Sequence, residues 1–424
     1  MRDRHAPQVA EGLGSAAVAP DEEFRFGIAR YLLGPGHPEA VAVVENGRAH
    51  QYASLREAVR RVEALLAGLG LAPGARVGIL APNSLFWIAA YLGVMTRYVA
   101  VPFSDRLTPA SAKRQAEFAD CRAMLIDRRQ ERSHGAAFDG VPMITDADLA
   151  AADPDQAPAP TPVDPETDAA LMFTSGTTAR PKAVRLTHRN LQDNTASIVS
   201  YLALDRDDRM LVVLPFYYCY GASLLHTHLR AGGSLVLCNT FAFPETAIEM
   251  LDREACTGFA GVPSTYQLLL RASTFATREL PSLRKLQQAG GKLPSALIGE
   301  LRRAQDKAQL FVMYGQTEAT ARLSYLPPEL LDSKPGSVGR GIPGVDLEVV
   351  DEAGIPVVPG QIGEIVASGA NISPGYLADP EATAAKFPGG RLRTGDLATV
   401  DDDGYISIVD RRDDFIKSWG HRVS

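Results

Sequence analysis

The sequence predicts an α/β fold: two mainly parallel-sheet lobes packed together, followed in the chain by a smaller β-rich lobe. Three observations support this prediction. Short apolar strands alternate with amphipathic helices from about residue 40 to 130, which is typical of a parallel sheet with helices on its faces. The alternation resumes after residue 168. Beyond Pro335, glycine and proline become frequent, and alternating apolar runs indicate a twisted, distorted-barrel lobe.

Length and composition agree with a large folded protein. The chain has 424 residues, of which 46% are hydrophobic and 22% charged, and its net charge is -7. A mildly acidic chain without a long basic run argues against nucleic acid or an anionic membrane as the main partner. The apolar run from Phe86 to Met95 is too short to span a bilayer. The four cysteines show no pairing pattern, so we expect a reducing, cytoplasmic location.

Composition also suggests where the domains divide. Residues 151–168 are rich in proline, alanine and aspartate, and we expect a linker there without regular structure. We therefore expect five segments: a loose N-terminal tail at 1–24, a first α/β lobe at 25–166, a second at 167–334, the β-rich lobe at 335–410 and a terminal segment at 411–424.

The elements of the first lobe follow from periodicity and turn signals. Ser54 and Glu57 form a predicted capping box for a helix. Its apolar face would carry Leu55, Val59, Val62, Leu65 and Leu66. Strands are expected at 77–80, 98–103 and 123–126, with a second helix after Pro82 and Asn83.

The later elements follow from the same signals. In the second lobe we expect a strand at 210–214, a helix from Gly221 to about Ala231 and a strand at 234–237, with further units at 243–270 and 283–313. In the β-rich lobe we expect strands at 346–350, 363–367 and 405–409.

The first chemical motif is TSGTTARPKA, which runs from Thr174 to Ala183 after an apolar strand at 169–173. A loop rich in glycine and hydroxyl groups offers backbone N–H donors to phosphate oxygens, with Lys182 as a point charge. The spacing is not that of the GxxxxGK[ST] phosphate loop. Taken alone, the segment is either a phosphate site or a polar surface loop.

Three further segments carry candidate chemistry. YGQTEAT follows the predicted strand at 309–313, where ligands bind in α/β sheets, and offers an aromatic ring, a hydroxyl and a carboxylate suited to Mg²⁺. RTGDL at 393–397 places Asp396 beside a glycine, as an acceptor for ribose hydroxyls or as part of a hairpin loop. The segment at 410–424, DRRDDFIKSWGHRVS, taken alone is a solvated charged turn.

In this order the four segments resemble the adenylate-forming superfamily of acyl-CoA synthetases, peptide adenylation domains and luciferases. The resemblance covers the chain from about residue 25 and includes LRKLQQAGGKLP at 283–294. It implies that ATP is bound with Mg²⁺, that AMP is released, and that CoA or a carrier-protein thiol accepts the acyl group.

The resemblance also implies roles for individual residues. The β- and γ-phosphates of ATP would be held by Thr174, Ser175, Gly176, Thr177, Thr178 and Lys182. Gly290 and Gly291 would let the adenine ring lie against the backbone, and Tyr314 would stack on it. Thr317 would contact the α-phosphate and Glu318 would coordinate Mg²⁺. The ribose would be bound by Asp396, supported by Arg411, and Asp413 matches the family's hinge residue.

The sequence departs from the family pattern in several places, two of which bear on adenylation. Ala179 and Ala183 stand where the phosphate loop usually has glycine, and a β-carbon disfavours positive φ, so we expect a stiffer loop. The family continues past the hinge into a small domain that supplies a lysine for adenylation. The given chain ends about 11 residues past Asp413, so we expect a chain cut at the hinge, without that domain and with impaired adenylation.

The acyl pocket is expected around FYYCYG at 216–221, which is aromatic and uncharged. No carboxylate is present to pair with an α-ammonium, and an unpaired ammonium in an apolar site costs several kcal/mol. A neutral aryl, alkyl or polycyclic carboxylic acid fits better. The candidate wall residues, which are equally compatible with an ordinary core, are Tyr218, Cys219, Tyr220, Gly261, Val262, Tyr266, Lys292, Gly315 and Leu323.

We predict an AMP-forming acid–thiol ligase that makes an acyl-adenylate and then a thioester. Three alternatives remain: an enzyme that only transfers a preformed acyl-adenylate, an adenylation domain that loads a carrier protein, and a non-catalytic nucleotide-binding protein. His226 and His228 do not indicate zinc, because residues i and i+2 point apart on a helix and no third ligand lies at the right spacing.

Overall fold

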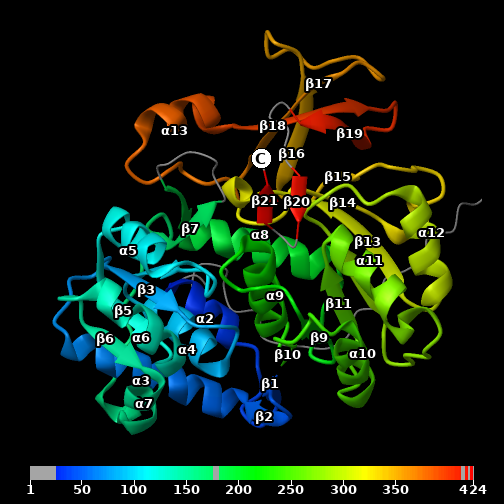
Figure 1. Cartoon of the computed structure of the whole chain (residues 1–424). Helices are drawn as coiled ribbons and strands as arrows, with labels where there is room; N and C mark the ends of the chain where they lie inside the picture. Colours follow the sequence, from blue (N-terminus) through cyan, green and yellow to red (C-terminus); the bar gives the residue numbers. More distant parts are fainter. Residues whose placement is uncertain (1–24, 175–180, 412–415, 419–420, 424) are drawn as a thin grey trace, which may run out of the picture.

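The computed structural model describes residues 25–174, 181–411, 416–418 and 421–423. Within this part of the chain, no helix is both long and apolar enough to cross a bilayer. The predicted fold class is confirmed: two large sheets with helices on their faces stand side by side, and a smaller antiparallel sheet lies above them (Figure 1).

The first large sheet has six strands in the order β6-β5-β3-β4-β7-β8. All neighbours are parallel except the last pair, β7 and β8, which form an antiparallel hairpin. Its central strands are continuous apolar runs, as expected for strands covered on both faces. The strands are β3 (Arg76–Leu80), β4 (Val99–Pro102), β5 (Cys121–Ile126), β6 (Met143–Thr145), β7 (Asp168–Thr174) and β8 (Lys182–Thr187).

The second large sheet has nine strands in the order β15-β14-β13-β12-β11-β9-β10-β1-β2, parallel from β13 to β1. The strands are β1 (Val41–Glu45), β2 (Arg48–Gln51), β9 (Arg209–Val212), β10 (Ser234–Leu237), β11 (Gly258–Gly261), β12 (Lys285–Gln288), β13 (Gln309–Tyr314), β14 (Ser324–Leu326) and β15 (Arg340–Gly341).

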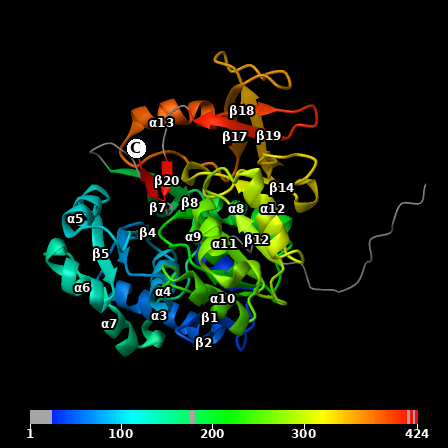
Figure 2. The ribbon, with the colours of Figure 1, turned by 45° about the vertical axis from the view of Figure 1, so that its right-hand side comes forward.

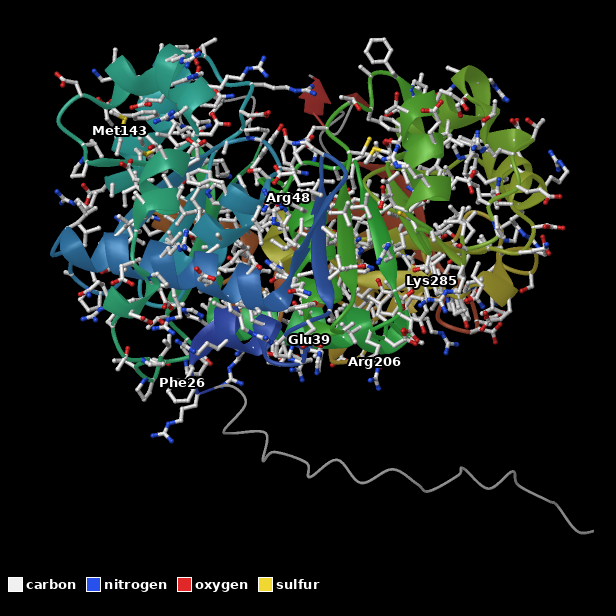
Figure 3. All side chains as sticks on the ribbon, turned by 90° about the horizontal axis from the view of Figure 1, so that it is seen from below. Phe26, Glu39, Arg48, Met143, Arg206 and Lys285 are labelled. Atoms are coloured by element: carbon white, nitrogen blue, oxygen red, sulfur yellow. The ribbon has the colours of Figure 1, made fainter. Side chains whose placement is uncertain are left out.

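The two sheets exchange strands, which the sequence pattern did not indicate. The β1–β2 hairpin lies within the predicted first lobe but pairs with β10 of the nine-stranded sheet, where it lies beside the green strands in Figure 3. Conversely, β7 and β8 follow the linker but complete the six-stranded sheet. The predicted boundary at 166/167 therefore falls before two strands that still belong to the first sheet.

Helices fill the space between the sheets and cover their outer faces. α8 (His188–Tyr201) and α9 (Cys219–Arg230) pack on each other and on α2 (Gly27–Leu33), in a core that contains buried residues from both sheets. A second core lies under α10 (Pro244–Arg253), α11 (Pro263–Ala272) and α12 (Ser295–Ala304). The other α-helices are α3 (Tyr52–Gly68), α4 (Leu85–Val94), α5 (Pro109–Phe118), α6 (Arg128–His134), α7 (Asp146–Ala151) and α13 (Pro380–Lys386).

The small lobe is an antiparallel sheet in the order β16-β17-β18-β19, which lies over the two large lobes in both Figure 1 and Figure 2. The pairings of β17 with β18 and of β18 with β19 each contain an irregularity, and such irregularities increase the twist of a sheet. The strands are β16 (Val345–Val350), β17 (Gly363–Gly369), β18 (Leu392–Val400) and β19 (Ile406–Arg411), followed by a two-stranded ribbon of β20 (Ile416–Ser418) and β21 (His421–Val423).

Two local predictions were wrong. α3 begins at Tyr52, so Ser54 and Glu57 lie inside the helix and form no capping box. The carbonyls of Ala40 and Pro38 accept from the N–H groups of Tyr52 and Ala53, so backbone groups from the preceding loop replace a capping side chain. The expected linker also contains one turn of 3₁₀ helix, η2 (Pro154–Gln156), which packs on α3.

Candidate functional site

The candidate phosphate loop joins β7 to β8. Thr174, the last residue of β7, pairs with Lys182, the first residue of β8, so the hairpin brings the two ends of the motif together. Ser175, Gly176, Thr177 and Thr178 lie outside the described residues, as does Ala179. Those parts of the prediction stay untested.

Ala183 does not have the backbone conformation that we expected to be strained. It lies in β8 opposite Phe173, it is buried, and its φ is not positive. A methyl group is therefore accommodated in ordinary strand geometry. Its carbonyl accepts from the N–H of Leu377 at 2.9 Å, which ties β8 to the segment that follows β17.

The chain turns sharply where β13 ends at Tyr314. A Cβ on Gly315 would lie 2.1 Å from the carbonyl oxygen of Ala321, so only glycine permits the returning chain to pass this closely. The 3₁₀ helix η4 (Thr317–Ala319) follows, and Thr320 closes it with a φ of +66°. This turn leaves the side chains of Thr317 and Glu318 half-buried at the carboxyl end of the sheet.

Glu318 and Lys182 meet at one tyrosine, Tyr376, from the segment after β17. The Tyr376 hydroxyl donates to Oε1 of Glu318 at 2.8 Å. The Lys182 ammonium lies 4.3 Å from the centre of the Tyr376 ring, a cation–π contact. The Mg²⁺ candidate and the phosphate-loop lysine are therefore held by the same side chain.

The small lobe contributes Asp396. This residue lies inside β18 rather than in a hairpin loop, beside Gly395, whose φ is +78°. The Tyr314 hydroxyl donates to Oδ2 of Asp396 at 2.6 Å, which joins the β13 turn to the small lobe. Arg411 is the register partner of Asp396 in β19, and the description of Arg411 is limited to its backbone.

The predicted adenine platform follows β12. Gly290 has a φ of +85°, and a Cβ there would lie 3.0 Å from a methyl group of Val262. The Gln288 side chain donates to the carbonyl of Gly291 at 2.8 Å and holds the turn. Lys292 is exposed and its ammonium lies 3.5 Å from the carbonyl of Ile408 in β19, so it reaches toward the small lobe rather than into a pocket.

The sequence matches a family model described as AMP-binding enzyme over residues 34–377. The chain belongs to the AMP-binding enzyme family. It is 34% identical over 393 residues to a feruloyl-CoA synthase of an Amycolatopsis species, which covers 91% of this chain and 78% of that protein. It is 31% identical to a 2-succinylbenzoate–CoA ligase of Bacillus pumilus, with the same two coverages.

A solved structure of ATP-bound MatB from Rhodopseudomonas palustris superposes on this AMP-binding enzyme with a TM-score of 0.85. It is 27% identical and covers 94% of this chain and 81% of that one. The structure of o-succinylbenzoate CoA synthetase from Bacillus subtilis with ATP and magnesium gives a TM-score of 0.82 at 26% identity, covering 94% of this chain and 82% of that one.

In this AMP-binding enzyme, the predicted pocket residues Cys219 and Tyr220 begin α9, and Tyr218 is its N-cap. The Thr317 hydroxyl lies 3.4 Å from the Cys219 sulfur, so the α-phosphate candidate and the pocket candidate are in contact. The Tyr218 ring packs 4.6 Å from that of Tyr217. Burial raises the pKa of the Tyr218 and Tyr220 hydroxyls, so both stay neutral.

Arg322 is a buried cation that the sequence prediction missed. It is 2% exposed, and its guanidinium lies 4.1 Å from the centre of the Tyr220 ring. Its Nη1 donates to the carbonyl of Ala321 at 3.5 Å, and its Nε has no partner among the described residues. Within the same described part of the chain, no carboxylate forms an ion pair with it. The wall next to Tyr220 is thus aromatic and positively charged.

The other wall candidates are closely packed. The hydroxyls of Tyr220 and Tyr266 both donate to the carbonyl of Gln287 at 2.8 Å, and both side chains are buried. A Cβ on Gly261 would lie 2.8 Å from the Thr265 side chain. Leu323 is fully buried and pairs through its N–H with the carbonyl of Tyr314.

The geometry around Glu318 fits a magnesium ion that is shared with ATP phosphates. Oε2 of Glu318 has no hydrogen-bond partner among the described residues, since Tyr376 occupies only Oε1. Mg²⁺ is usually held in such sites by one or two carboxylates together with phosphate oxygens. In the described ranges there is no group of three or more His, Cys, Asp or Glu side chains that would form an all-protein metal cage.

His226 and His228 are core residues. His226 lies 3.2 Å from the Tyr91 hydroxyl and stacks on that ring, while Nδ1 of His228 lies 2.9 Å from the carbonyl of Leu224. Burial lowers the pKa of His226 to about 3 and that of His228 to about 4, so both imidazoles stay neutral. Neither forms a metal cluster with other described residues.

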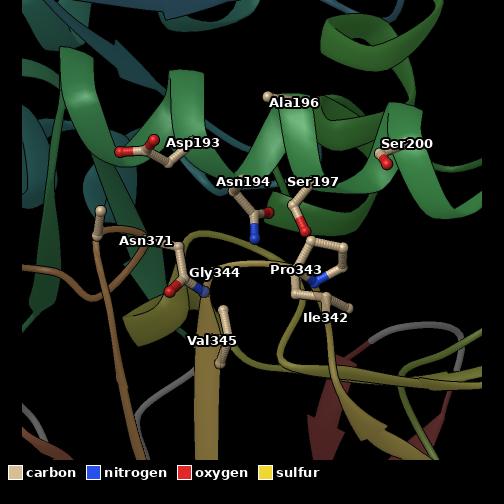
Figure 4. Close-up of a pocket in the computed structure, with 11 residues that line it drawn as sticks. Asp193, Asn194, Ala196, Ser197, Ser200, Ile342, Pro343, Gly344, Val345 and Asn371 are labelled. Carbon is tan, nitrogen blue, oxygen red and sulfur yellow. The ribbon is translucent and has the colours of Figure 1, made fainter.

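A cavity of about 300 Å³ lies behind the Glu318 turn, between α8 and the small lobe (Figure 4). Asn194 and Asn371 both line it, and both donate to the carbonyl of Arg322 at 3.0 Å. Asn371 donates also to the carbonyl of Ala319, at 3.3 Å. The turn that presents Thr317 and Glu318 is therefore fixed from behind by two buried amides.

Sequence reasoning missed Tyr376, Arg322 and Asn371. A signal existed for two of them: SPGYL begins four residues after the end of β17, and Arg322 lies two residues past the YGQTEAT motif. Asn371 gave no signal, because its partners are backbone carbonyls about 50 residues away. Asp413 lies outside the described residues, so its predicted hinge role stays a prediction.

Proposed function

We propose that this protein is an AMP-forming acid–CoA ligase, which activates a carboxylic acid as its adenylate and then transfers the acyl group to CoA. One observation supports this most strongly: residues from the β7–β8 hairpin, the β13 turn and the small lobe are joined by direct contacts. Lys182 contacts Tyr376, Tyr376 binds Glu318, and Tyr314 binds Asp396. The names of the relatives, all CoA ligases or synthases, support the same reaction class.

In the first step, a carboxylate oxygen of the acid attacks the α-phosphorus of ATP. The bond from that phosphorus to the bridging oxygen breaks, and pyrophosphate leaves with the electron pair. Mg²⁺ would neutralise phosphate charge when bound. The chain's own residues would position the reactants: Thr317 at the α-phosphate, Lys182 at the outer phosphates, Tyr314 against adenine and Asp396 on the ribose.

In the second step, the sulfur of CoA attacks the acyl carbon of the adenylate, and AMP leaves as the phosphate-bound oxygen takes the electron pair. The thiol proton leaves to solvent or to a phosphate oxygen. No side chain needs to form a covalent bond, so positioning and charge stabilisation are the contribution of the protein.

The substrate is proposed to be an acid without an α-ammonium group. Two of the pocket candidates at 218–220 are tyrosines and none carries a charge, and the buried charge that contacts Tyr220, Arg322, is positive. An ammonium placed there would meet a like charge and no carboxylate, which is unfavourable in a buried site. Neutral aryl, alkyl and polycyclic acids remain the proposed class.

The test uses stable acyl-sulfamoyl-adenosine analogues of a panel of acids, with thermal unfolding as the readout. A ligand at 100 times its Kd stabilises the folded state by about 2.7 kcal/mol, even without turnover. We expect aryl and alkyl analogues to raise the Tm and aminoacyl analogues not to do so. No shift with any adenylate analogue would contradict the proposal.

The acceptor is tested separately by mass spectrometry of the thioester product, with CoA and with a phosphopantetheinylated carrier protein in parallel reactions. The proposal expects the CoA thioester. A product on the carrier protein alone would favour an adenylation domain. A thioester from a supplied acyl-adenylate but no ATP–pyrophosphate exchange would favour the transfer-only enzyme.

A further inference from the structure

Tyr376 lies outside all the motifs from which the nucleotide site was predicted, yet it contacts two of their charged residues. It belongs to the segment that leaves β17 and returns toward α13, and it is 6% exposed.

The segment around Tyr376 is fastened to both halves of the site. The N–H of Leu377 donates to the carbonyl of Ala183, and Tyr376 forms an isolated β-bridge with Val184, so the segment follows β8. On the other side, the N–H of Ser373 donates to the backbone carbonyl of Glu318 at 2.9 Å. The tyrosine therefore has a fixed distance to both Lys182 and Glu318.

Both the backbone and the ring of Tyr376 are also held by residues of α13 and the segment after it. Its backbone N–H donates to Oγ1 of Thr383 at 3.0 Å, and its ring packs edge-on against Phe387, 5.6 Å between centres. The hydroxyl acts as the donor in its hydrogen bond to the Glu318 carboxylate.

A carboxylate with one oxygen bound to a rigid donor has a defined orientation for the other. Here Tyr376 occupies Oε1 of Glu318 at 2.8 Å, and Oε2 has no partner among the described residues. The face of the same ring holds the Lys182 ammonium, which lies 4.3 Å from the ring centre.

We propose that Tyr376 is a positioning residue that orients Glu318 for the magnesium ion of Mg·ATP and keeps Lys182 beside the phosphates. This inference rests on the proposed function. Tyr376 would then contribute to the affinity for nucleotide only when Mg²⁺ is present. It would not contribute to the binding of AMP, whose base and sugar would contact Tyr314 and Asp396.

The test compares the wild type with Tyr376→Phe, which removes only the hydroxyl and keeps the ring for Lys182. Calorimetry measures the Kd of α,β-methylene-ATP with Mg²⁺ and with EDTA, and the Kd of AMP with EDTA. A hydrogen bond to a charged group commonly changes an equilibrium by tenfold or more. We expect the Mg²⁺-dependent gain in affinity to fall about tenfold, with AMP binding unchanged.

Tyr52→Phe is the matched control. Tyr52 is also buried, and its hydroxyl donates to the backbone carbonyl of Gly233 at 2.7 Å, a residue that is not among the site candidates. This variant loses a buried hydrogen bond as well, so it reports the general cost of such a loss. It should keep the wild-type response to Mg²⁺.

The outcomes separate the two claims. If wild-type protein binds neither nucleotide, the proposed function fails and the role of Tyr376 falls with it. If the wild type responds to Mg²⁺ and Tyr376→Phe responds equally, the positioning role is overturned while the function stands. Equal losses for AMP and for the Mg²⁺ complex would mean a merely structural residue and would also overturn it.

Discussion

At the scale of single residues, the same kind of hydrogen bond occurs twice in the candidate site. Each of its two acidic residues accepts a hydrogen bond from a buried tyrosine hydroxyl: Tyr376 binds Glu318 and Tyr314 binds Asp396. A carboxylate that accepts from a fixed phenol keeps its orientation without losing its charge. The sequence motifs supplied the acids and Tyr314, but the pairs form only because β13, β17 and β18 meet in the fold.

Asp396 is predicted to read the ribose hydroxyls. Asp396→Asn keeps the size of the side chain but removes its charge, so the charge-assisted bonds to the sugar weaken. We expect AMP affinity to fall by about tenfold, and the preference for AMP over 2′,3′-dideoxy-AMP to shrink by a similar factor. Calorimetry of the four protein–ligand pairs measures this.

The comparison of the two ligands is the internal control. A general loss of site structure would weaken both AMP and the dideoxy nucleotide and leave their ratio unchanged. An unaltered ratio in Asp396→Asn would therefore count against a ribose contact, whatever happened to the absolute affinities.

At the scale of elements, the turn that follows β13 is held from behind. Asn194 on α8 and Asn371 after β17 both donate to the carbonyl of Arg322, and Thr320 donates its hydroxyl to the carbonyl of Asn371. These bonds join a helix of the central core, a turn of the nine-stranded sheet and the small lobe. The position of Thr317 and Glu318 therefore depends on all three elements.

Asn371→Ala tests this dependence. It leaves the carbonyls of Ala319 and Arg322 with fewer donors in a buried place, which costs about 1–3 kcal/mol in the free energy of unfolding. We expect a lower urea midpoint, and weaker Mg²⁺-dependent nucleotide binding because Glu318 is less well placed. Denaturation and calorimetry on the same preparation measure the two effects.

Ser200→Ala is the control for the cavity itself. Ser200 lines the same cavity on α8 but is exposed, and it donates no hydrogen bond to the turn (Figure 4). It should leave both measurements unchanged. If Asn371→Ala unfolds and binds nucleotide as the wild type does, the turn is held without this amide.

At the scale of the whole molecule, three buried histidines lie on the two helices that pack between the sheets: His188 on α8, and His226 and His228 on α9. Burial lowers the pKa of His188 to about 4, as it does for His228, and that of His226 to about 3. His188 must be neutral, because its Nδ1 accepts from the N–H of Ile28 at 3.1 Å. The N-terminal helix α2 is thus tied to α8 through an acceptor that protonation would remove.

This arrangement predicts loss of stability in mild acid. The unfolded chain takes up a proton at each imidazole near pH 6.5 and the folded chain does not, so stability is full above about pH 6.5 and falls as the pH drops toward 4. Each histidine contributes a slope of at most about 1.4 kcal/mol per pH unit. Urea unfolding at pH 7.5 and 5.0 measures the change.

His188→Asn isolates one contribution. The asparagine oxygen can accept from Ile28 in the place of Nδ1 and does not titrate, so the variant should lose less stability between the two pH values than the wild type does. Equal losses in the two proteins would contradict the assignment of this pH dependence to His188.

Most of the local structure was predictable from the sequence alone. The strands at 77–80, 234–237 and 309–313 and the helix near 221–231 were read from apolar runs, because burial of continuous apolar segments depends on the residues themselves. The start of α3 could not be predicted in this way, since backbone carbonyls of Pro38 and Ala40 replace a capping side chain. Glu318, Asp396 and Lys182 were candidates because their motifs are local.

The sequence by itself determined the fold class, the family and the local motifs, since each depends on residues that are neighbours in the chain. The tertiary structure decided which strands join which sheet, and it brought Tyr376, Arg322 and Asn371 to those motifs. These three act on groups that are distant in sequence: Tyr376 lies 58 residues from Glu318, and only folding makes them neighbours. A contact of that kind leaves no periodic or local pattern that a single sequence can display.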